Sequence, residues 1–344
     1  MKTRITDLLG IRYPIVEGGM QWIGRARLAA AVSNAGALGM VTARTLPTPD
    51  DLRREIDLTR ELTDKPFGVN LTLAFASAGM SYDGWIDAII DSDIKVVETA
   101  GNKPQAVVER LKAHGITVIH KCTSVRHALS AERYGVDVIS IDGFEAAGHP
   151  GEDDVPGMVL IPAAMRALSV PVIASGGIAD GRAMAAALAL GADGINMGTR
   201  FMLTREAEIH DNIKQALVAA TERDTILIKR TLKYTARFFT NAVSEEIVAL
   251  ERRPGGATFD DIKHLMSGVR GQAGLASGDA NAGLICASQV IGLIDDIPSC
   301  AELIARMVAD CRGALEGTLR AFDEIPPPRV VTPLSGRLDH ALDA

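Results

Sequence analysis

Eight short apolar runs alternate with helix-forming segments between Pro14 and Met197, and this alternation limits the fold more than any other feature. The runs are apolar throughout, as in parallel strands that are covered on both faces. Strands are expected at 14–17, 37–41, 67–71, 95–99, 116–120, 136–141, 172–174 and 192–197. Eight repeats of this length predict an α/β fold, a (β/α)8 TIM barrel.

A doubly wound open sheet would show the same alternation of strands and helices. Such a sheet carries GxGxxG after its first strand. This chain has Gly18-Gly19-Met20-Gln21 at that position, which is a different motif. The barrel is therefore favoured. The side chains of Ser124 and Asp180, and that of Thr48 or Asp50, are predicted to cap helices.

Three regions are expected in the 344-residue chain. Residues 1–205 form the barrel, and residues 206–322 form a mostly helical lid or appendage that returns to it. Helices are expected at 206–223, 260–266 and 301–322, whereas 267–283, rich in glycine, alanine and serine, is expected to be mobile or to reach toward the active site. Residues 323–344, with three consecutive prolines, read as an extended or disordered tail.

The composition excludes several classes of partner. The net charge is −7, without a basic block, which disfavours nucleic acid and anionic membranes. No apolar run reaches the length of a membrane span, and the first residues do not resemble a signal peptide. Four cysteines, far apart in sequence, predict neither a disulfide framework nor a zinc site and favour a cytoplasmic location: Cys122, Cys286, Cys300 and Cys311.

Two glycine turns follow the expected seventh and eighth strands, in the stretch 171–202. Ser175-Gly176-Gly177 ends the seventh strand, and Gly198-Thr199 ends the eighth. In TIM barrels these two loops often hold a phosphate on their backbone N–H groups. The chain lacks GxxxxGK[ST], so a nucleoside triphosphate is disfavoured and the phosphate of a mononucleotide cofactor fits best.

Other strand ends carry residues suited to a flat ligand. Gly18 and Gly19 allow close approach of the backbone, although on their own they are better explained by a plain tight turn. Asn70 could bind a polar ring edge or cap a turn. Lys121 could hold negative charge on a reduced ring or be a surface lysine that snorkels. His120 and Lys121 cannot both face the barrel mouth, because neighbouring strand residues point to opposite faces.

The loop after the sixth strand begins at Asp142 and contains a single histidine. His149 stands between glycine and proline breaks and is the best candidate for general acid–base catalysis, because histidine titrates near neutral pH. The run Glu152-Asp153-Asp154 is as well explained by a solvated loop or a helix start as by a metal site, and no metal is predicted. Cys122 is interpreted as a small buried residue.

The motifs together resemble the FMN-dependent nitronate monooxygenase family, formerly called 2-nitropropane dioxygenases. The resemblance runs through the barrel to about residue 322, and its most specific part is the block at 142–153. The motifs that carry it are GGMQW at 18–22, ETAGN at 98–102, HKCT at 120–123, DGFEAAGHPGED at 142–153, ASGG at 174–177 and NMGTRF at 196–201.

The resemblance implies non-covalent FMN at the barrel mouth. The residues expected to hold its phosphate are Ser175, Gly176, Gly177, Gly198 and Thr199. The residues expected to meet its ring and ribityl chain are Gly19, Met20, Gln21, Asn70, Lys121, Asp142 and Gly148, with Ala147 beside them. His149 matches the histidine that is catalytic in the monooxygenases.

The resemblance implies oxidation of alkyl nitronates with O2. Several motifs look closest to a bacterial subgroup of NADH:quinone reductases, so NADH as co-substrate and a quinone as acceptor form the alternative; a flavin-dependent enoyl reductase is a weaker one. A barrel that binds a phosphosugar or acts as a lyase without flavin is the competing class. A purely binding role is disfavoured, because polar groups at several strand ends have no structural need. A homodimer is compatible with the sequence.

Overall fold

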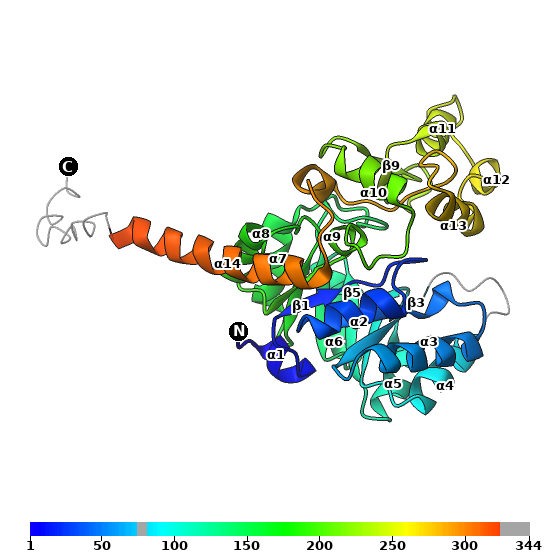
Figure 1. The fold of residues 1–344 in the computed structure, drawn as a ribbon. Coiled ribbons are helices and arrows are strands. Elements are labelled where there is room, and N and C mark those ends of the chain that lie inside the picture. The colour runs from blue at the N-terminus through cyan, green and yellow to red at the C-terminus, as the bar shows by residue number, and fades with distance from the viewer. Residues whose placement is uncertain (74–80, 324–344) are drawn as a thin grey trace, which may run out of the picture.

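The computed structural model describes residues 1–73 and 81–323, and its core is a closed parallel barrel (Figure 1). The eight strands are hydrogen-bonded in the order β1-β8-β7-β6-β5-β4-β3-β2. A parallel bridge between Val16 and Leu38 closes the ring between β1 and β2. The strands are β1 Ile15–Glu17, β2 Gly39–Thr42, β3 Phe67–Leu73, β4 Val96–Gly101, β5 Thr117–Cys122, β6 Val138–Asp142, β7 Val172–Ser175 and β8 Gly194–Met197. The predicted TIM barrel is confirmed.

Helices follow the strands and cover the outside of the barrel, while α1 precedes β1. They are α1 Arg4–Leu9, α2 Ala26–Asn34, α3 Pro49–Leu62, α4 Asp83–Asp91, α5 Gln105–Lys112, α6 Val125–Arg133, α7 Gly157–Ala167 and α8 Gly181–Ala189. The predicted caps are confirmed at Thr48, Ser124 and Asp180, whose side chains each accept a hydrogen bond from a backbone N–H of the first turn. Local capping chemistry thus sets where these helices begin.

The barrel interior changes from apolar to polar along the strands. Val96, Ile119 and Ile173 belong to one buried cluster that also contains Ile5 and Leu9 of α1, and this cluster fills the lower barrel. Two residues further along each strand the side chain points inward again. Glu98, Lys121 and Ser175 occupy those positions. The layer of side chains nearest the carboxyl ends of the strands is therefore polar, and it forms the floor of any site at that end of the barrel.

The region after the barrel contains more strand than the sequence suggested. It consists of α9 Thr199–Met202, α10 Asp211–Val218, β9 Thr225–Ile228, β10 Ala236–Phe239, α11 Ala242–Glu251, α12 Phe259–Ile262, α13 Gly268–Ser277 and α14 Cys300–Asp323. The antiparallel hairpin β9–β10 was not predicted, and the helix expected at 206–223 covers only α10. The segment 267–283, expected to be mobile or to reach toward the active site, contains α13 and contributes to the lining of a cavity at the barrel mouth.

Helix α14 returns the chain to the barrel, as expected. Its first half packs against α8, and the approach is so close that a Cβ on Gly181 would overlap the backbone of Met307 and Cys311. Its second half extends beyond the barrel (Figure 1). In the part of the chain that the structure describes, no helix is long and apolar enough to cross a membrane. The predicted tail, apart from Asp323, lies outside the described residues.

Candidate active site

A cavity of about 1050 Å³ opens at the carboxyl ends of the strands, between the barrel and the appendage. Every residue predicted for the site lines it. The predicted lining residues are Gly19, Met20, Gln21, Asn70, Lys121, Asp142, Ala147, Gly148, His149, Ser175, Gly176, Gly177, Gly198 and Thr199. The structure thus brings together residues that lie up to 180 positions apart in the sequence.

The floor of the cavity is organised by Glu98, a residue that was quoted in a motif but not predicted for the site. The Glu98 carboxylate accepts hydrogen bonds from the Gly19 N–H (3.0 Å) and from the side-chain amides of Asn70 and Asn196 (2.8 Å each). Glu98 and both asparagines are buried. Asn70 lies inside β3, so its interpretation as a turn cap is wrong.

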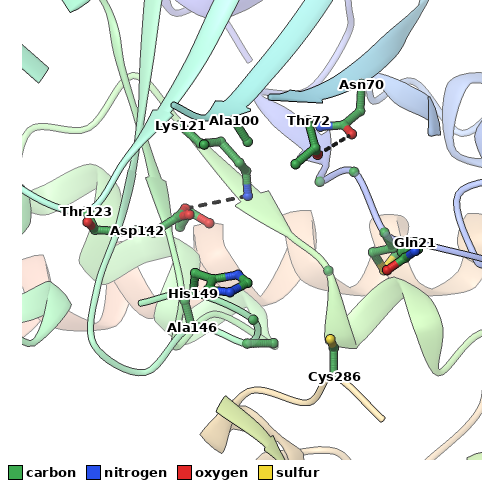
Figure 2. A pocket seen from close by; sticks show the side chains of 18 of the residues that line it. Gln21, Asn70, Thr72, Ala100, Lys121, Thr123, Asp142, Ala146, His149 and Cys286 are labelled. Atoms are coloured by element: carbon green, nitrogen blue, oxygen red, sulfur yellow. Dashed lines mark hydrogen bonds and ion pairs between the residues drawn. The ribbon is translucent and has the colours of Figure 1, made fainter. Parts of the chain in front are cut away.

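Lys121 points into the barrel, and its ammonium lies 3.5 Å from Oδ1 of Asp142 (Figure 2). Burial lowers the pKa of Lys121, but the charges of Asp142 and Glu98 outweigh it and leave the pKa raised. Lys121 is therefore a cation held in place at the floor, and the interpretation as a snorkelling surface lysine is wrong. Strand β5 also extends to Cys122, two residues beyond the predicted end.

His120 takes the opposite side of β5, as the alternation of strand side chains requires. Its Nδ1 lies 2.8 Å from Oγ1 of Thr99, and the residue is buried. Burial and the nearby His127 lower its pKa to about 4. His120 is thus a neutral histidine that belongs to the barrel wall. Cys122 is also buried, and burial raises the pKa of its thiol to about 12, which makes it inert as predicted.

The two glycine turns present unused backbone donors to the cavity. Gly176 and Gly177 have φ values of +83° and +74°, which suit glycine, and both follow directly on β7. Among the described residues, no acceptor receives the backbone N–H groups of Gly176, Gly177, Gly198 or Thr199. The Thr199 hydroxyl accepts from the Ser288 N–H at 3.0 Å, which fixes its position and leaves its O–H as a further donor. The donors left for an anion are therefore mainly backbone groups.

The turn after β1 forms another wall of the cavity. A Cβ on Gly19 would overlap the side chain of Asn70, and one on Gly18 would lie 2.5 Å from Oδ1 of Asn196. Glycine is thus required at both positions for the turn to sit on the floor. The Met20 N–H donates to Oγ1 of Thr42 over 3.0 Å, which fixes the turn against β2. The interpretation as a plain tight turn does not account for these contacts.

His149 lies on the cavity wall and meets residues of the appendage. Its Nε2 is 3.1 Å from Nζ of Lys229, and its ring lies 4.5 Å from that of Tyr234, centroid to centroid. Burial and the Lys229 charge lower the pKa of His149 to about 4. The imidazole is neutral at physiological pH, and with Nε2 accepting from Lys229 its proton resides on Nδ1. His149 can therefore accept a proton but does not start as an acid.

The appendage is tied to the loop after β6 by contacts that the sequence did not reveal. Gly148 and Arg237 of β10 exchange backbone hydrogen bonds of 3.1 and 2.6 Å. Glu152 accepts from the N–H and hydroxyl of Thr235 at 2.6 Å each, and Asp154 pairs with Arg230. Glu152 and Asp154 thus anchor the appendage, and the whole run 152–154 is exposed in the loop before α7, which confirms the prediction of a solvated loop.

The cavity residues from the appendage that were missed include Lys229, Tyr234 and Cys286. No motif surrounds them, and Lys229 meets His149 across 80 positions of sequence. Recognition of the turn between β9 and β10, which was not predicted, would have indicated Lys229 and Tyr234. Within the described residues no group of three or more histidine, cysteine or acidic side chains is arranged to hold a metal ion.

The sequence profile of a family described as nitronate monooxygenase matches residues 2–310. A Rhodococcus jostii protein named (3aS,4S,5R,7aS)-5-hydroxy-7a-methyl-1-oxo-octahydro-1H-indene-4-carboxyl-CoA dehydrogenase is 32% identical over 93% of this chain and 99% of its own length. A probable nitronate monooxygenase of Staphylococcus aureus is 33% identical over 73% of this chain and 81% of its own.

Solved structures agree with these relatives. FabK from Thermotoga maritima has a TM-score of 0.86 and 36% identity, and the match covers 94% of this chain and 99% of that one. A nitroalkane oxidase from Streptomyces ansochromogenes has a TM-score of 0.77 and 27% identity, covering 91% and 99% of the two chains. These matches span both the barrel and the appendage.

Proposed function

Because the chain belongs to the nitronate monooxygenase family and is an oxidoreductase, we propose that it is an FMN-dependent enzyme that oxidises alkyl nitronates with O2. One observation carries the proposal. Four backbone N–H groups that find no acceptor among the described residues, and a fixed cation on the cavity floor, Lys121, lie at the mouth of the same barrel. A mononucleotide with a flat, reducible ring needs both features.

The residues present fit FMN. The phosphate would rest on the backbone of 175–177 and 198–199, where donors have no acceptor in the described part of the chain. The ring would lie on the floor made by the turn after β1, with Lys121 close enough to favour negative charge on it. The cofactor supplies the electron transfer, and the protein supplies position and charge.

His149 and the appendage would form the substrate side. A nitronate is already deprotonated at its carbon, so the neutral imidazole would act on it as a hydrogen-bond donor through Nδ1, and the position of the ring is fixed by Lys229 and Tyr234. The appendage closes the cavity above the loop after β6, which would shield the reacting groups from bulk water.

Reduction or oxidation of a coenzyme A thioester is the second candidate. It is favoured by the Rhodococcus jostii relative, whose name specifies a carboxyl-CoA and whose match covers nearly its entire length. A cavity of about 1050 Å³ is also larger than a short alkyl nitronate requires. NADH:quinone reduction is the third candidate and uses the same FMN site.

Anaerobic mixing separates these activities. The purified protein is expected to be yellow and to release FMN on denaturation; a colourless preparation that cannot be reconstituted with FMN would refute the flavoenzyme proposal. Propyl-2-nitronate is expected to bleach the flavin. Bleaching by NADH alone, with the nitronate leaving the flavin oxidised, would exclude the monooxygenase and support the reductase. Bleaching by a saturated acyl-CoA would support the thioester activity.

A further inference from the structure

Lys229 is a buried cation that forms no ion pair with a carboxylate of the described residues. The residue is 5% exposed and follows directly on β9, in a left-handed conformation with φ +62°. Its ammonium lies 3.1 Å from Nε2 of His149 and 4.2 Å from the centre of the Tyr234 ring. Within the described residues no carboxylate oxygen lies within 4.0 Å of this ammonium. Two of its three N–H donors are left for something in the cavity.

The two carboxylates whose charges act on Lys229, Glu251 and Glu152, form their hydrogen bonds with other groups. Glu251 accepts from the backbone N–H groups of Lys229 and Thr231, and Glu152 accepts from Thr235. Both hold the hairpin in shape, and neither bonds the Lys229 ammonium. Burying a cation costs desolvation free energy unless an anion pairs with it, and a ligand could supply that anion.

Lys121, the other lysine of the cavity, differs in this respect. Its ammonium is held by Asp142 and faces Glu98, so its charge is compensated within the barrel floor. Lys229 enters from the appendage and lies beside His149, and within the described residues no carboxylate pairs with its ammonium. The two lysines therefore suit different partners.

We propose that Lys229 binds the negatively charged oxygen of the substrate. This rests on the proposed function and narrows it: the substrate presents a planar oxyanion, such as a nitronate or an enolate, to Lys229 while its reacting carbon faces His149. A charge-assisted hydrogen bond from the ammonium fixes that oxygen and stabilises its charge. A neutral quinone offers no such group.

The pH dependence of anion binding follows from the groups around Lys229. Burial lowers the pKa of Lys229 to about 8, against the opposing effect of Cys286, Glu251 and Glu152. Burial raises the pKa of the Cys286 thiol to about 11 and that of Tyr234 above its usual value, and His149 is neutral. Between pH 7 and pH 9 Lys229 is thus the group here that changes charge, and anion affinity is expected to fall as pH rises through 8.

Nitrate, a planar oxyanion, is the probe, and its Kd is measured by calorimetry on the FMN-loaded full-length protein. Wild type is expected to bind nitrate about tenfold more weakly at pH 9 than at pH 7, because the charged fraction of Lys229 falls about tenfold. Lys229→Met should weaken binding at pH 7 by at least about tenfold. Lys229→Arg should keep the affinity and lose the pH dependence, because arginine stays charged.

Lys233→Met is the matched control: Lys233 is an exposed lysine of the same turn, also with positive φ, and its loss should leave nitrate binding unchanged. Equal nitrate affinity of wild type and Lys229→Met, or a wild-type Kd that is constant from pH 7 to pH 9, would overturn the proposal. The heat of binding does not depend on turnover. Failure of the flavin to react with nitronate would therefore count against the proposed function and leave this test intact.

Discussion

The side-chain amide of Asn70 donates to Oε1 of Glu98 over 2.8 Å, from the strand next to it in the barrel. Oε1 also accepts from Gly19, and Oε2 accepts from Asn196 of β8. One carboxylate thus ties three strands and the first glycine turn into a single floor.

Replacing Glu98 is therefore expected to disrupt both fold and cofactor binding. Glu98→Ala leaves two buried amides and one N–H without an acceptor, and the free energy of unfolding should fall by about 3 kcal/mol. Urea unfolding and FMN content are the measurements. Glu61→Ala, at an exposed position of α3, should change neither. Retention of full stability and FMN by Glu98→Ala would show that neither the fold nor FMN binding depends on the hydrogen bonds to this carboxylate.

Lys121→Met is expected to make the bound flavin harder to reduce. Loss of the ammonium beside Asp142 removes positive charge from the floor and leaves that carboxylate uncompensated. A loss of about 1.4 kcal/mol corresponds to a midpoint potential about 30 mV more negative for a two-electron couple. Spectroelectrochemical titration measures it. Lys112→Met, on the outer surface, is the control, and an unchanged potential in Lys121→Met would remove this role.

His149→Ala is expected to retain FMN and to slow nitronate oxidation by about 10²- to 10⁴-fold. The wild-type rate should not change between pH 6 and pH 7, because the pKa of His149 is lowered to about 4, so that the imidazole stays neutral, and the pKa of Lys229 is about 8, so that the ammonium stays charged. Stopped-flow reduction of the flavin at several pH values measures both effects. His264→Ala, at an exposed position outside the cavity, should behave as wild type. Unchanged turnover in His149→Ala would exclude the residue from the reaction.

Buried His120 is expected to make the fold sensitive to mild acid. Its pKa is about 4 in the folded protein, below the 6.5 of a free histidine, so its stabilising effect is complete above pH 6.5 and is lost as pH falls toward 4. At 1.36 kcal/mol per unit, the loss is about 3 kcal/mol. Denaturant unfolding at pH 7 and pH 4.5 should show a smaller difference for His120→Gln than for wild type or exposed His114→Gln. Equal differences in all three would contradict the assignment.

Replacement by alanine should change the free energy of unfolding in opposite directions at two glycines: Gly181, where α8 meets α14, and Gly313, at an open position of α14. Gly181→Ala places a methyl group against the backbone of α14 and should lower the free energy of unfolding by about 1–3 kcal/mol. Gly313→Ala, at an open position of α14, should raise it by about 0.5–1 kcal/mol, because alanine favours the helix. A stability loss in Gly313→Ala, or none in Gly181→Ala, would refute the close packing of α8 and α14.

The barrel could be predicted from the sequence because its information is local. Apolar runs, caps such as Ser124 and the glycine turns each depend on a few neighbouring residues. The cavity walls made by strand ends follow from the fold once the strands are known. Glu98, in the middle of β4, could not be singled out, because its function as an acceptor depends on residues from three other segments.

The appendage shows the opposite situation. The hairpin β9–β10 is short and half-exposed, and its pairing with Gly148 connects residues almost 90 positions apart. Nothing in the surrounding sequence marks Lys229 as a buried cation, since an isolated lysine after a short apolar run usually faces solvent. The residues that the sequence missed are therefore those that depend on long-range docking.

The bridge between Gly148 and Arg237 has a consequence for how this enzyme can diversify. The wall proposed for the phosphate is built by β7, β8 and their turns, whereas Lys229, Tyr234 and Cys286 come from a later segment, which is attached to the loop after β6 and to Thr199. Substitutions in that segment can reshape what the cavity admits while the strands and glycine turns stay as they are. New substrates are thus accessible by changes that leave the folding of the barrel untouched.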